Sequence, residues 1–377
     1  TGSCHALIVT GCMAQRYQKE IIEEVPEVDA VLGTTSYGDI VKALEEAVAG
    51  NHFEEFRDID YLPDTGSKRV LTTGGHFGYL KIAEGCDKHC TYCIIPKLRG
   101  KFRSVPMERL IAQAEDMAEQ GVKELILVAQ ETTVYGKDLY GKKSLHILLK
   151  KLCEIRGIRW IRILYCYPEE IYDELIETIR DEKKICHYLD IPIQHASDRI
   201  LKRMGRRTSK QELIDIVGKL RKEIPDIVLR TTLITGFPGE TEEDHEELKE
   251  FVDEMEFDRL GVFTYSPEED TPAATMPDQV AEEVKEARRD EIMELQQEIS
   301  YDKGTDRIGQ ELLVMIEGKV ADESAYIGRT YGDAPKVDGY IFVQTGELLM
   351  TGDFAKVRVT GALEYDLIGE LADEYTE

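Results

Sequence analysis

Apolar and polar positions follow one another along this chain in blocks that predict a regular series of strands and helices. Short apolar runs are typical of buried strands, and stretches with a 3.6-residue periodicity lie between them. The predicted strands cover residues 79–83, 124–129, 160–164, 188–191, 228–235 and 260–265. The predicted helices cover residues 107–120, 145–153, 171–181, 209–224 and 242–255.

Such alternation predicts an α/β domain whose parallel strands are joined by right-handed crossovers. Six units fall short of the eight that close a TIM barrel. We therefore expect a partial barrel with an open side that can admit a large substrate. An open doubly wound sheet fits the same count, although no GxGxxG follows the first strand.

A smaller region precedes this central unit. Two short apolar runs and two helical stretches alternate within residues 1–50, which predicts part of an α/β domain. Its strands are expected at residues 5–10 and 28–33, and its helices at 14–24 and 39–49. Residues 51–77 show no periodicity and are predicted to form a linker.

Another small region follows the central unit. A charged helix over residues 279–303 is expected to complete the central domain, 78–303. From residue 304 to 377 the pattern changes to short strands separated by turns, which predicts a small all-β barrel.

Bulk composition describes a protein of two or three domains, with 377 residues, 42% of them hydrophobic and 32% charged. No apolar run approaches the roughly 20 residues that a membrane span needs. No secretory signal is apparent, and the chain opens Thr-Gly-Ser without a methionine, so we expect the native start to be missing. The cytoplasm is the expected compartment.

Net charge restricts the partners. At −27 the chain repels phosphate backbones unless a local basic groove is present, and it attracts basic proteins. The last 73 residues, 305–377, carry fifteen acidic and six basic side chains, a net of −9. Ribosomal proteins are partners of the required charge, and the alternative is that the acidity serves solubility alone.

Three of the eight cysteines lie close together in EGCDKHCTYCIIPKLRG, directly after the first predicted barrel strand. Cys86, Cys90 and Cys93 have the spacing CxxxCxxC, with no fourth ligand at the distance usual for zinc. Thiolates bind both zinc and iron–sulfur clusters. A structural zinc site or a redox pair is the alternative, but the spacing favours a 4Fe–4S cluster with one iron left open.

The CxxxCxxC spacing, with Tyr92 before the last cysteine, resembles that of the radical S-adenosylmethionine (SAM) enzymes. The resemblance implies that three thiolates hold three irons and that the fourth iron chelates the amino and carboxylate groups of SAM. One electron then cleaves SAM and yields a deoxyadenosyl radical, while the protein orients the reactants.

Longer motifs resemble the methylthiotransferases within that superfamily. They include ILVAQETTVYG, YLDIPIQHASDRILKRMGR and LRTTLITGFPGETEEDHEEL, and the C-terminal region resembles a TRAM domain. The family implies a second 4Fe–4S cluster on the N-terminal domain, from which sulfur is delivered. Cys12, in VTGCMAQRY, matches its third ligand, and the other two are expected upstream of Thr1, which leaves this site incomplete in the printed chain.

Further residues are implied as SAM contacts by the same resemblance. Gln130 and Glu131 end the second barrel strand and match the position of an amino-group contact. Arg230 suits a bidentate bond to the methionine carboxylate, with a barrel-edge salt bridge as its alternative. The glycine-rich turn with Gly236 and Pro238 allows backbone to approach the adenine.

Two neighbouring residues, Gln194 and His195, leave the fourth strand toward the same mouth. Gln194 is expected to contact SAM. His195 is a candidate substrate contact, with a satisfied loop histidine as the alternative. Cys153, Cys166 and Cys186 are expected to be buried free cysteines, and the basic residues Arg203, Arg206 and Arg207 a solvated face.

The branches of the methylthiotransferase family differ in the substrate that they modify. DIPIQHASD resembles the branch that modifies an aspartate of small-subunit ribosomal protein S-twelve, free or within the small subunit. The deoxyadenosyl radical would take hydrogen from the aspartate β-carbon, and sulfur methylated by a second SAM would couple there. A transfer RNA adenosine methylthiotransferase is the alternative. RNA is not expected as the main contact, an external electron donor is implied, and a monomer suffices.

Overall fold

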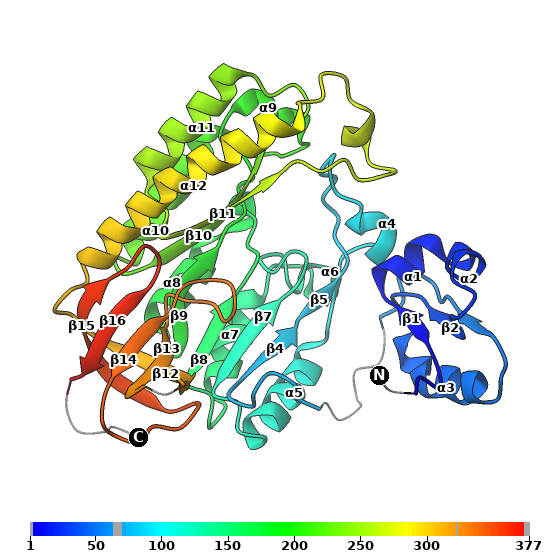
Figure 1. The fold of residues 1–377 in the computed structure, drawn as a ribbon, viewed down its shortest axis with the longest axis horizontal. Helices are drawn as coiled ribbons and strands as arrows, with labels where there is room; N and C mark the ends of the chain where they lie inside the picture. The colour runs from blue at the N-terminus through cyan, green and yellow to red at the C-terminus, as the bar shows by residue number, and fades with distance from the viewer. Residues whose placement is uncertain (1–2, 63–69, 322, 373–377) are drawn as a thin grey trace.

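A six-stranded parallel sheet forms the centre of the protein (Figure 1). The computed structural model describes residues 3–62, 70–321 and 323–372. The strand order is β11-β10-β9-β8-β7-β4, so that β4 and β11 are the two edges. Their bounds are β4 (Phe77–Lys81), β7 (Glu124–Val128), β8 (Trp160–Ile163), β9 (Ile185–Asp190), β10 (Val228–Thr235) and β11 (Arg259–Thr264). The predicted partial barrel with an open side is confirmed.

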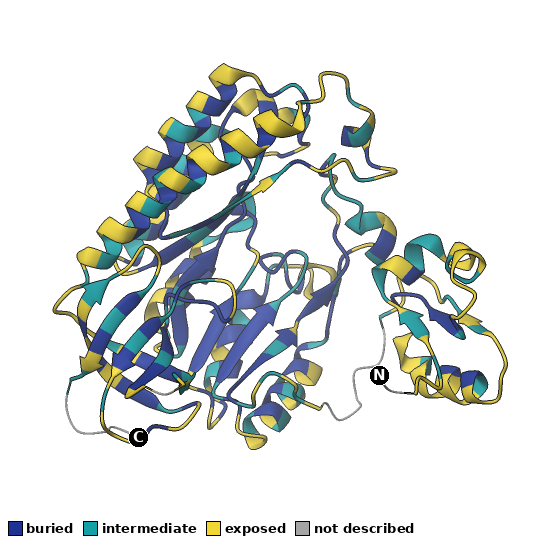
Figure 2. Ribbon diagram, viewed as in Figure 1, coloured by how far each residue is buried: buried dark blue, intermediate teal, exposed yellow. Residues whose placement is uncertain are grey.

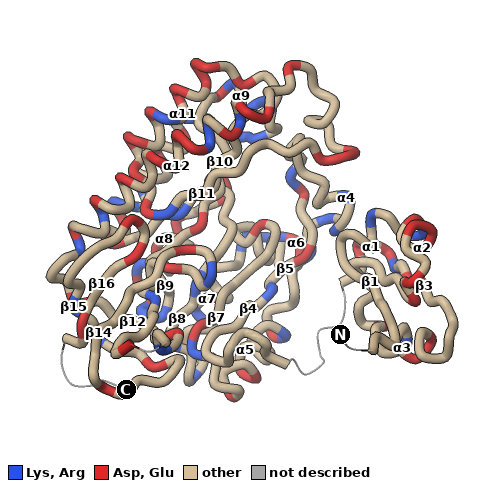
Figure 3. Tube along the Cα trace, in the orientation of Figure 1, with Lys and Arg blue, Asp and Glu red and all other residues tan. Residues whose placement is uncertain are grey.

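Helices cover the outer face of this sheet. The main ones are α5 (Met107–Glu119), α7 (Leu145–Cys153), α8 (Asp173–Asp181), α10 (Lys210–Glu223), α11 (Glu242–Met255) and α12 (Glu282–Thr305). Shorter ones lie at the loops: α4 (Ile95–Arg99), η2 (Pro168–Glu170), α6 (Lys137–Tyr140), α9 (Asp198–Arg203) and η3 (Pro272–Thr275). Figure 2 shows strands β7, β8, β9 and β10 mostly buried, the edge strand β11 less so, and the outward sides of α11 and α12 exposed. Figure 3 shows that Asp and Glu are frequent on those two helices. None of the helices among the described residues is long and apolar enough to cross a membrane.

The N-terminal domain is a three-stranded parallel sheet with order β1-β2-β3. Its elements are β1 (Ile8–Thr10), α1 (Cys12–Tyr17), α2 (Lys19–Glu24), β2 (Ala30–Leu32), η1 (Tyr37–Asp39), α3 (Ile40–Val48) and β3 (Phe53–Glu55). The helix expected at 14–24 is divided at Gln18, whose φ is 42°. The segment 51–77, predicted as a linker, supplies β3, and its residues 63–69 lie outside the described part.

A closed five-stranded barrel forms the C-terminal domain, as expected. Its strands are β12 (Glu311–Lys319), β13 (Ala325–Thr330), β14 (Ile341–Gln344), β15 (Phe354–Ala362) and β16 (Leu367–Leu371). This barrel packs into the base of the partial barrel, where Trp160 and Tyr188 of the sheet meet Met315 and Phe354.

Buried charges join the two barrels. The Glu124 carboxylate accepts hydrogen bonds from Arg162 Nε at 2.7 Å and from Arg329 Nη2 at 2.6 Å, and all three side chains are fully buried. Because Glu124 begins β7 and Arg329 lies on β13, this network fixes the C-terminal barrel beneath the site.

Candidate functional site

The cysteine loop leaves the carboxyl end of β4 and returns through a small hairpin of β5 (Ala83–Glu84) and β6 (Arg103–Ser104). Cys86 N donates to Gly100 O at 3.1 Å, which closes the base of the loop. Gly85 has a φ of +78°, and a Cβ on it would lie 2.1 Å from Lys101 O, so only glycine fits there. The backbone thus holds the three cysteines at the barrel mouth.

The three thiols are largely withdrawn from solvent. Cys86 and Cys90 are 8% and 7% exposed, and Cys93 is half-buried. Burial, with smaller contributions from the neighbouring thiols of Cys90 and Cys93, raises the pKa of Cys86 to about 11. Burial and Cys90 likewise raise the pKa of Cys93. Three free thiols that influence one another and carry no disulfide are a suitable donor set for an iron–sulfur cluster.

The arrangement differs from that of a single-ion site. Among residues 3–62, 70–321 and 323–372, no three His, Cys, Asp or Glu side chains converge as ligands of one metal ion. Zinc–sulfur bonds of about 2.3 Å would require the sulfurs to converge. In a cluster each thiolate binds a different iron, and three thiols on one short loop are the donor set that such a cluster requires.

Tyr167 is a neighbour of the loop that the sequence reading missed. Its hydroxyl lies 3.5 Å from Cys90 Sγ, and Arg206 stacks over its ring with Cζ 4.3 Å from the centroid. Arg206 is itself buried and donates from Nη2 to Pro192 O at 2.8 Å. Arg206 therefore does not form the solvated face expected of it, because its guanidinium is covered by an aromatic ring at the site.

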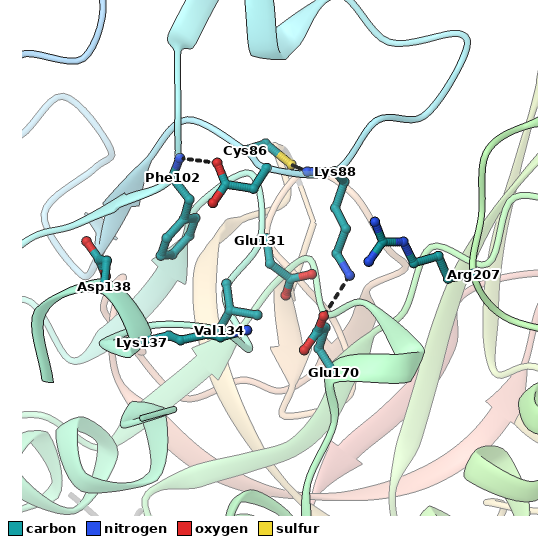
Figure 4. Close-up of a pocket in the computed structure, with 10 residues that line it drawn as sticks. Cys86, Lys88, Phe102, Glu131, Val134, Lys137, Asp138, Glu170 and Arg207 are labelled. Atoms are coloured by element: carbon teal, nitrogen blue, oxygen red, sulfur yellow. Dashed lines mark hydrogen bonds and ion pairs between the residues drawn. The ribbon is translucent and has the colours of Figure 1, made fainter. Parts of the chain in front are cut away.

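A cavity of about 300 Å³ adjoins Cys86 (Figure 4). Glu131 and Lys88 line it, and Lys88 forms ion pairs with Glu169 and Glu170. Burial raises the pKa of Glu131 to about 7, although its hydrogen bonds with Thr133 oppose this effect. Gln130 Oε1 and Glu131 Oε2 are buried without a protein hydrogen-bond partner, so both are available to a ligand.

Another cavity, of about 360 Å³, lies on the side of Tyr92. Gln194 and Arg230 also line it, together with Phe263 and Tyr165. Thus the structure brings Tyr92, Gln194 and Arg230 together, whereas Glu131 lines the cavity next to Cys86. Gln194 has a φ of 73°, a left-handed conformation that its two backbone hydrogen bonds to β10 hold in place.

Arg230 is bound by two carboxylates in this structure. Its Nη1 donates to Asp190 Oδ1 at 2.8 Å, and its Nε lies 3.4 Å from Asp338 Oδ1 of the C-terminal barrel. The side chain nevertheless lines the cavity with Tyr92. Its role toward the SAM carboxylate stays a prediction.

The glycine turn is fixed by neighbours from α12. Gly236 has a φ of +69°, and a Cβ on it would lie 2.1 Å from Lys285 Cγ. The Glu240 carboxylate accepts from Gly236 N at 2.8 Å and from Arg288 Nη1 at 2.9 Å. Phe237 packs edge-on against Tyr92, with 6.3 Å between centroids, so the turn adjoins the cysteine loop. Pro238 O accepts from Arg203 Nε at 2.9 Å.

His195 lines neither of the two cavities. It is fully buried, its Nδ1 accepts from Ser197 N at 3.0 Å, and its Nε2 lies 3.4 Å from Glu240 Oε2. Because Nε2 has no hydrogen-bond partner in this position, the histidine is buried but only partly satisfied, and its contact with substrate stays a prediction. Cys166 and Cys186 are buried as expected, and Cys153 is half-buried.

Cys12 lies at the start of α1, next to the cysteine loop. Arg99 Nε, on α4, donates to Cys12 Sγ at 3.2 Å. Thr34 Oγ1 donates to Leu98 O at 2.9 Å and fastens β2 to the same helix. The structure therefore places Cys12 beside the loop that carries the three cysteines, and its role as an auxiliary ligand stays a prediction.

Comparisons with known proteins agree with this architecture. The radical SAM superfamily profile matches residues 80–252, and the TRAM domain profile matches residues 308–372. The ribosomal protein uS12 methylthiotransferase RimO of Lachnoclostridium phytofermentans is 65% identical over 98% of this chain and 84% of its own length. RimO of Clostridium perfringens is 52% identical over 99% of this chain and 83% of its own length. RimO of Clostridioides difficile is 48% identical over 99% of this chain and 84% of its own length.

A solved structure is similar more distantly. Coproporphyrinogen III oxidase (HemN) from Escherichia coli, a radical SAM enzyme, has 16% sequence identity and a TM-score of 0.47 over 75% of this chain and 66% of that chain. The relatives and the profile together define the class: this chain is a radical SAM enzyme with a TRAM domain. Within that class it belongs to the RimO family of methylthiotransferases.

Proposed function

We propose that this protein transfers a methylthio group to the β-carbon of an aspartate in ribosomal protein uS12, the small-subunit protein S-twelve. The observation that carries the proposal is 65% identity over 98% of the chain to a uS12 methylthiotransferase, together with the intact CxxxCxxC loop. The alternative substrate, a transfer RNA adenosine, is less favoured, because a C-terminal region of net charge −9 is a poor surface for phosphates.

In this proposal Cys86, Cys90 and Cys93 hold a 4Fe–4S cluster, and Cys12 is one ligand of an auxiliary cluster. When bound, the first cluster supplies the electron that cleaves SAM into methionine and a deoxyadenosyl radical. The buried oxygens of Gln130 and Glu131 would accept hydrogen bonds from the SAM amino group. Tyr92, which lines the 360 Å³ cavity, would contact SAM there.

The remaining residues orient SAM and exclude water. Gln194 and Arg230 line the cavity beside Tyr92, where an arginine suits a carboxylate. The backbone of the turn with Gly236 and Pro238 would contact the adenine, and a Cβ at Gly236 would displace Lys285, which packs against this turn. These assignments are part of the proposal.

A basic protein substrate fits the acidic C-terminal barrel, since complementary charge speeds encounter. An external one-electron donor must reduce the cluster. The reaction would take place in the cytoplasm, on uS12 either free or within the small subunit, and a single copy of the chain suffices.

The test is mass spectrometry of uS12 after anaerobic incubation with enzyme in which both clusters are reconstituted, together with SAM and a reductant. We expect a methylthio group on one aspartate. Cys90→Ser should abolish the product, whereas Cys153→Ser, which changes a half-buried cysteine of α7, should retain it. Modification of transfer RNA in place of uS12 would overturn the proposal.

A further inference from the structure

The last strand of the sheet, β11, has a free edge beside the mouth of the barrel. It pairs with β10, and no other strand among the described residues pairs with it. Tyr265 N donates to Thr235 O at 2.8 Å. Because successive residues of a parallel strand direct their N–H and C=O groups to alternate sides, those of Phe263 face β10. The backbone groups of Val262 and Thr264 therefore face the open edge.

An exposed aromatic side chain adjoins this edge. Phe263 is 63% exposed, although its neighbours in the strand are buried or half-buried. Both Phe263 and Thr264 line the 360 Å³ cavity that also contains Gln194 and Arg230. The free edge thus leads directly to the place where SAM contacts are predicted. An open strand edge is a template for another chain, which proteins normally cover or block.

We propose that this edge of β11 binds an extended segment of the protein substrate as an added strand. The backbone groups of Val262 and Thr264 would continue the ladder, and Phe263 would pack against a substrate side chain. Added strands gain affinity from main-chain hydrogen bonds and specificity from neighbouring pockets. The inference rests on the proposed function, and it assigns the surface that brings the target aspartate to the cavity.

Charge on the flanks of the edge suits uS12, a protein expected to be basic. Glu268 and Glu269, just beyond β11, are 42% and 77% exposed and share one cation, Arg16, so this group keeps a net negative charge. At the other end Arg259 is paired with Asp333 of the acidic C-terminal barrel at 2.6 Å. A nucleic acid lacks the repeating N–H and C=O groups that a strand edge recognises. The edge therefore selects a polypeptide over RNA.

The test compares two substitutions of one residue. Thr264→Pro removes the N–H that faces the open edge and leaves the ladder to β10, because proline is tolerated on an edge strand whose N–H faces solvent. Thr264→Ala keeps that N–H and removes the hydroxyl. We expect purified uS12 to bind the proline variant about 3- to 10-fold more weakly than the alanine variant. Equal affinities of the two variants would overturn the inference.

A second measurement requires no substitution. Hydrogen exchange at the amides of Val262 and Thr264 in the wild-type chain should slow when uS12 is added. If exchange at these amides slows with rising enzyme concentration in the absence of uS12, the edge pairs with a second copy of the chain. If exchange slows when RNA alone is added, the edge is a nucleic-acid surface. Either result would overturn the inference. If uS12 does not bind the wild type at all, the proposed function fails with it, whereas binding without protection at β11 overturns this inference alone.

Discussion

Arg99 on the cysteine loop donates a hydrogen bond from Nε to Cys12 Sγ of the N-terminal domain, at 3.2 Å. The same guanidinium lies 3.4 Å from the carboxylate of Glu84, whose side chain is 6% exposed. Four residues after Cys12, Arg16 forms an ion pair with Glu268, which follows β11. Helix α1 therefore contacts segments that follow both edge strands of the open barrel, β4 and β11.

Loss of the Arg99 contact should loosen this domain interface. Arg99→Leu removes the bond to Cys12 and leaves Glu84 with Lys81 as its ion-pair partner. Hydrogen bonds to charged groups contribute about 1.5–3 kcal/mol. We expect amide exchange in α1 to accelerate at least about tenfold while exchange in β7 is unchanged, and Arg99→Lys to show a smaller effect. Unchanged exchange in α1 would contradict this account.

The buried network between the barrels should dominate stability. Arg329→Met removes one partner of Glu124 and leaves a buried carboxylate with Arg162 alone. Breaking a buried pair in this way costs about 3–5 kcal/mol. Urea denaturation should detect that loss. Arg358→Met, which removes an exposed pair with Glu311, should cost less than about 1 kcal/mol.

Acid should weaken the same network. Burial by itself raises the pKa of Glu124, but Arg162 and Arg329 outweigh burial, so the pKa lies below the ordinary 4.5. A carboxyl with a depressed folded pKa adds stability above its unfolded pKa, and this is lost as pH falls through the folded pKa. The difference in unfolding free energy between wild type and Arg329→Met should therefore be constant above pH 4.5 and shrink below that pH. A difference that grows in acid would contradict the assignment.

The sequence predicts the series of strands and helices well, because strands such as β10 and helices such as α7 and α11 have clear periodicity. It does not predict the break at Gln18 or strand β3, because a φ of 42° and a three-residue edge strand leave no pattern. Short elements are set by tertiary contacts that local sequence does not encode.

The candidate site divides in the same way. The cysteine spacing and the glycine turn are visible in the sequence because local backbone geometry demands those residue types. Tyr167, Glu240 and Lys285 reach the site from other elements, and only the fold brings them there. The burial of His195 likewise depends on its packing against Glu240, which lies 45 positions later.

Substitution of Gly236 should impair both folding and SAM binding. Gly236→Ala places a Cβ 2.1 Å from Lys285 Cγ at a φ of +69°, so Lys285 must move and the turn is strained. We expect a stability loss of about 1–3 kcal/mol and weaker SAM binding, measured by thermal unfolding and equilibrium dialysis. Gly218→Ala is the matched control, because this glycine of α10 has open space around its Cβ position and alanine favours helix. Equal effects of the two substitutions would contradict the account.

The ionisation of Glu131 should govern SAM affinity. Burial raises the pKa of Glu131 to about 7, so the carboxyl is mainly protonated at pH 6 and mainly ionised at pH 8. If it holds the SAM amino group as predicted, the affinity of wild type relative to Glu131→Gln should rise about tenfold between these pH values. Titration of SAM itself affects both proteins equally. A pH-independent ratio would exclude Glu131 from this role.

The central claim is that the three-cysteine loop supports radical cleavage of SAM directed at a ribosomal protein. The most direct measurement is deoxyadenosine release by the anaerobically reconstituted, reduced protein with SAM, in the presence of uS12, of transfer RNA, or of neither. The account predicts release that rises with uS12 and not with transfer RNA, and that disappears in Cys90→Ser. Release stimulated by transfer RNA alone, or zinc bound in place of iron with no release, would contradict it.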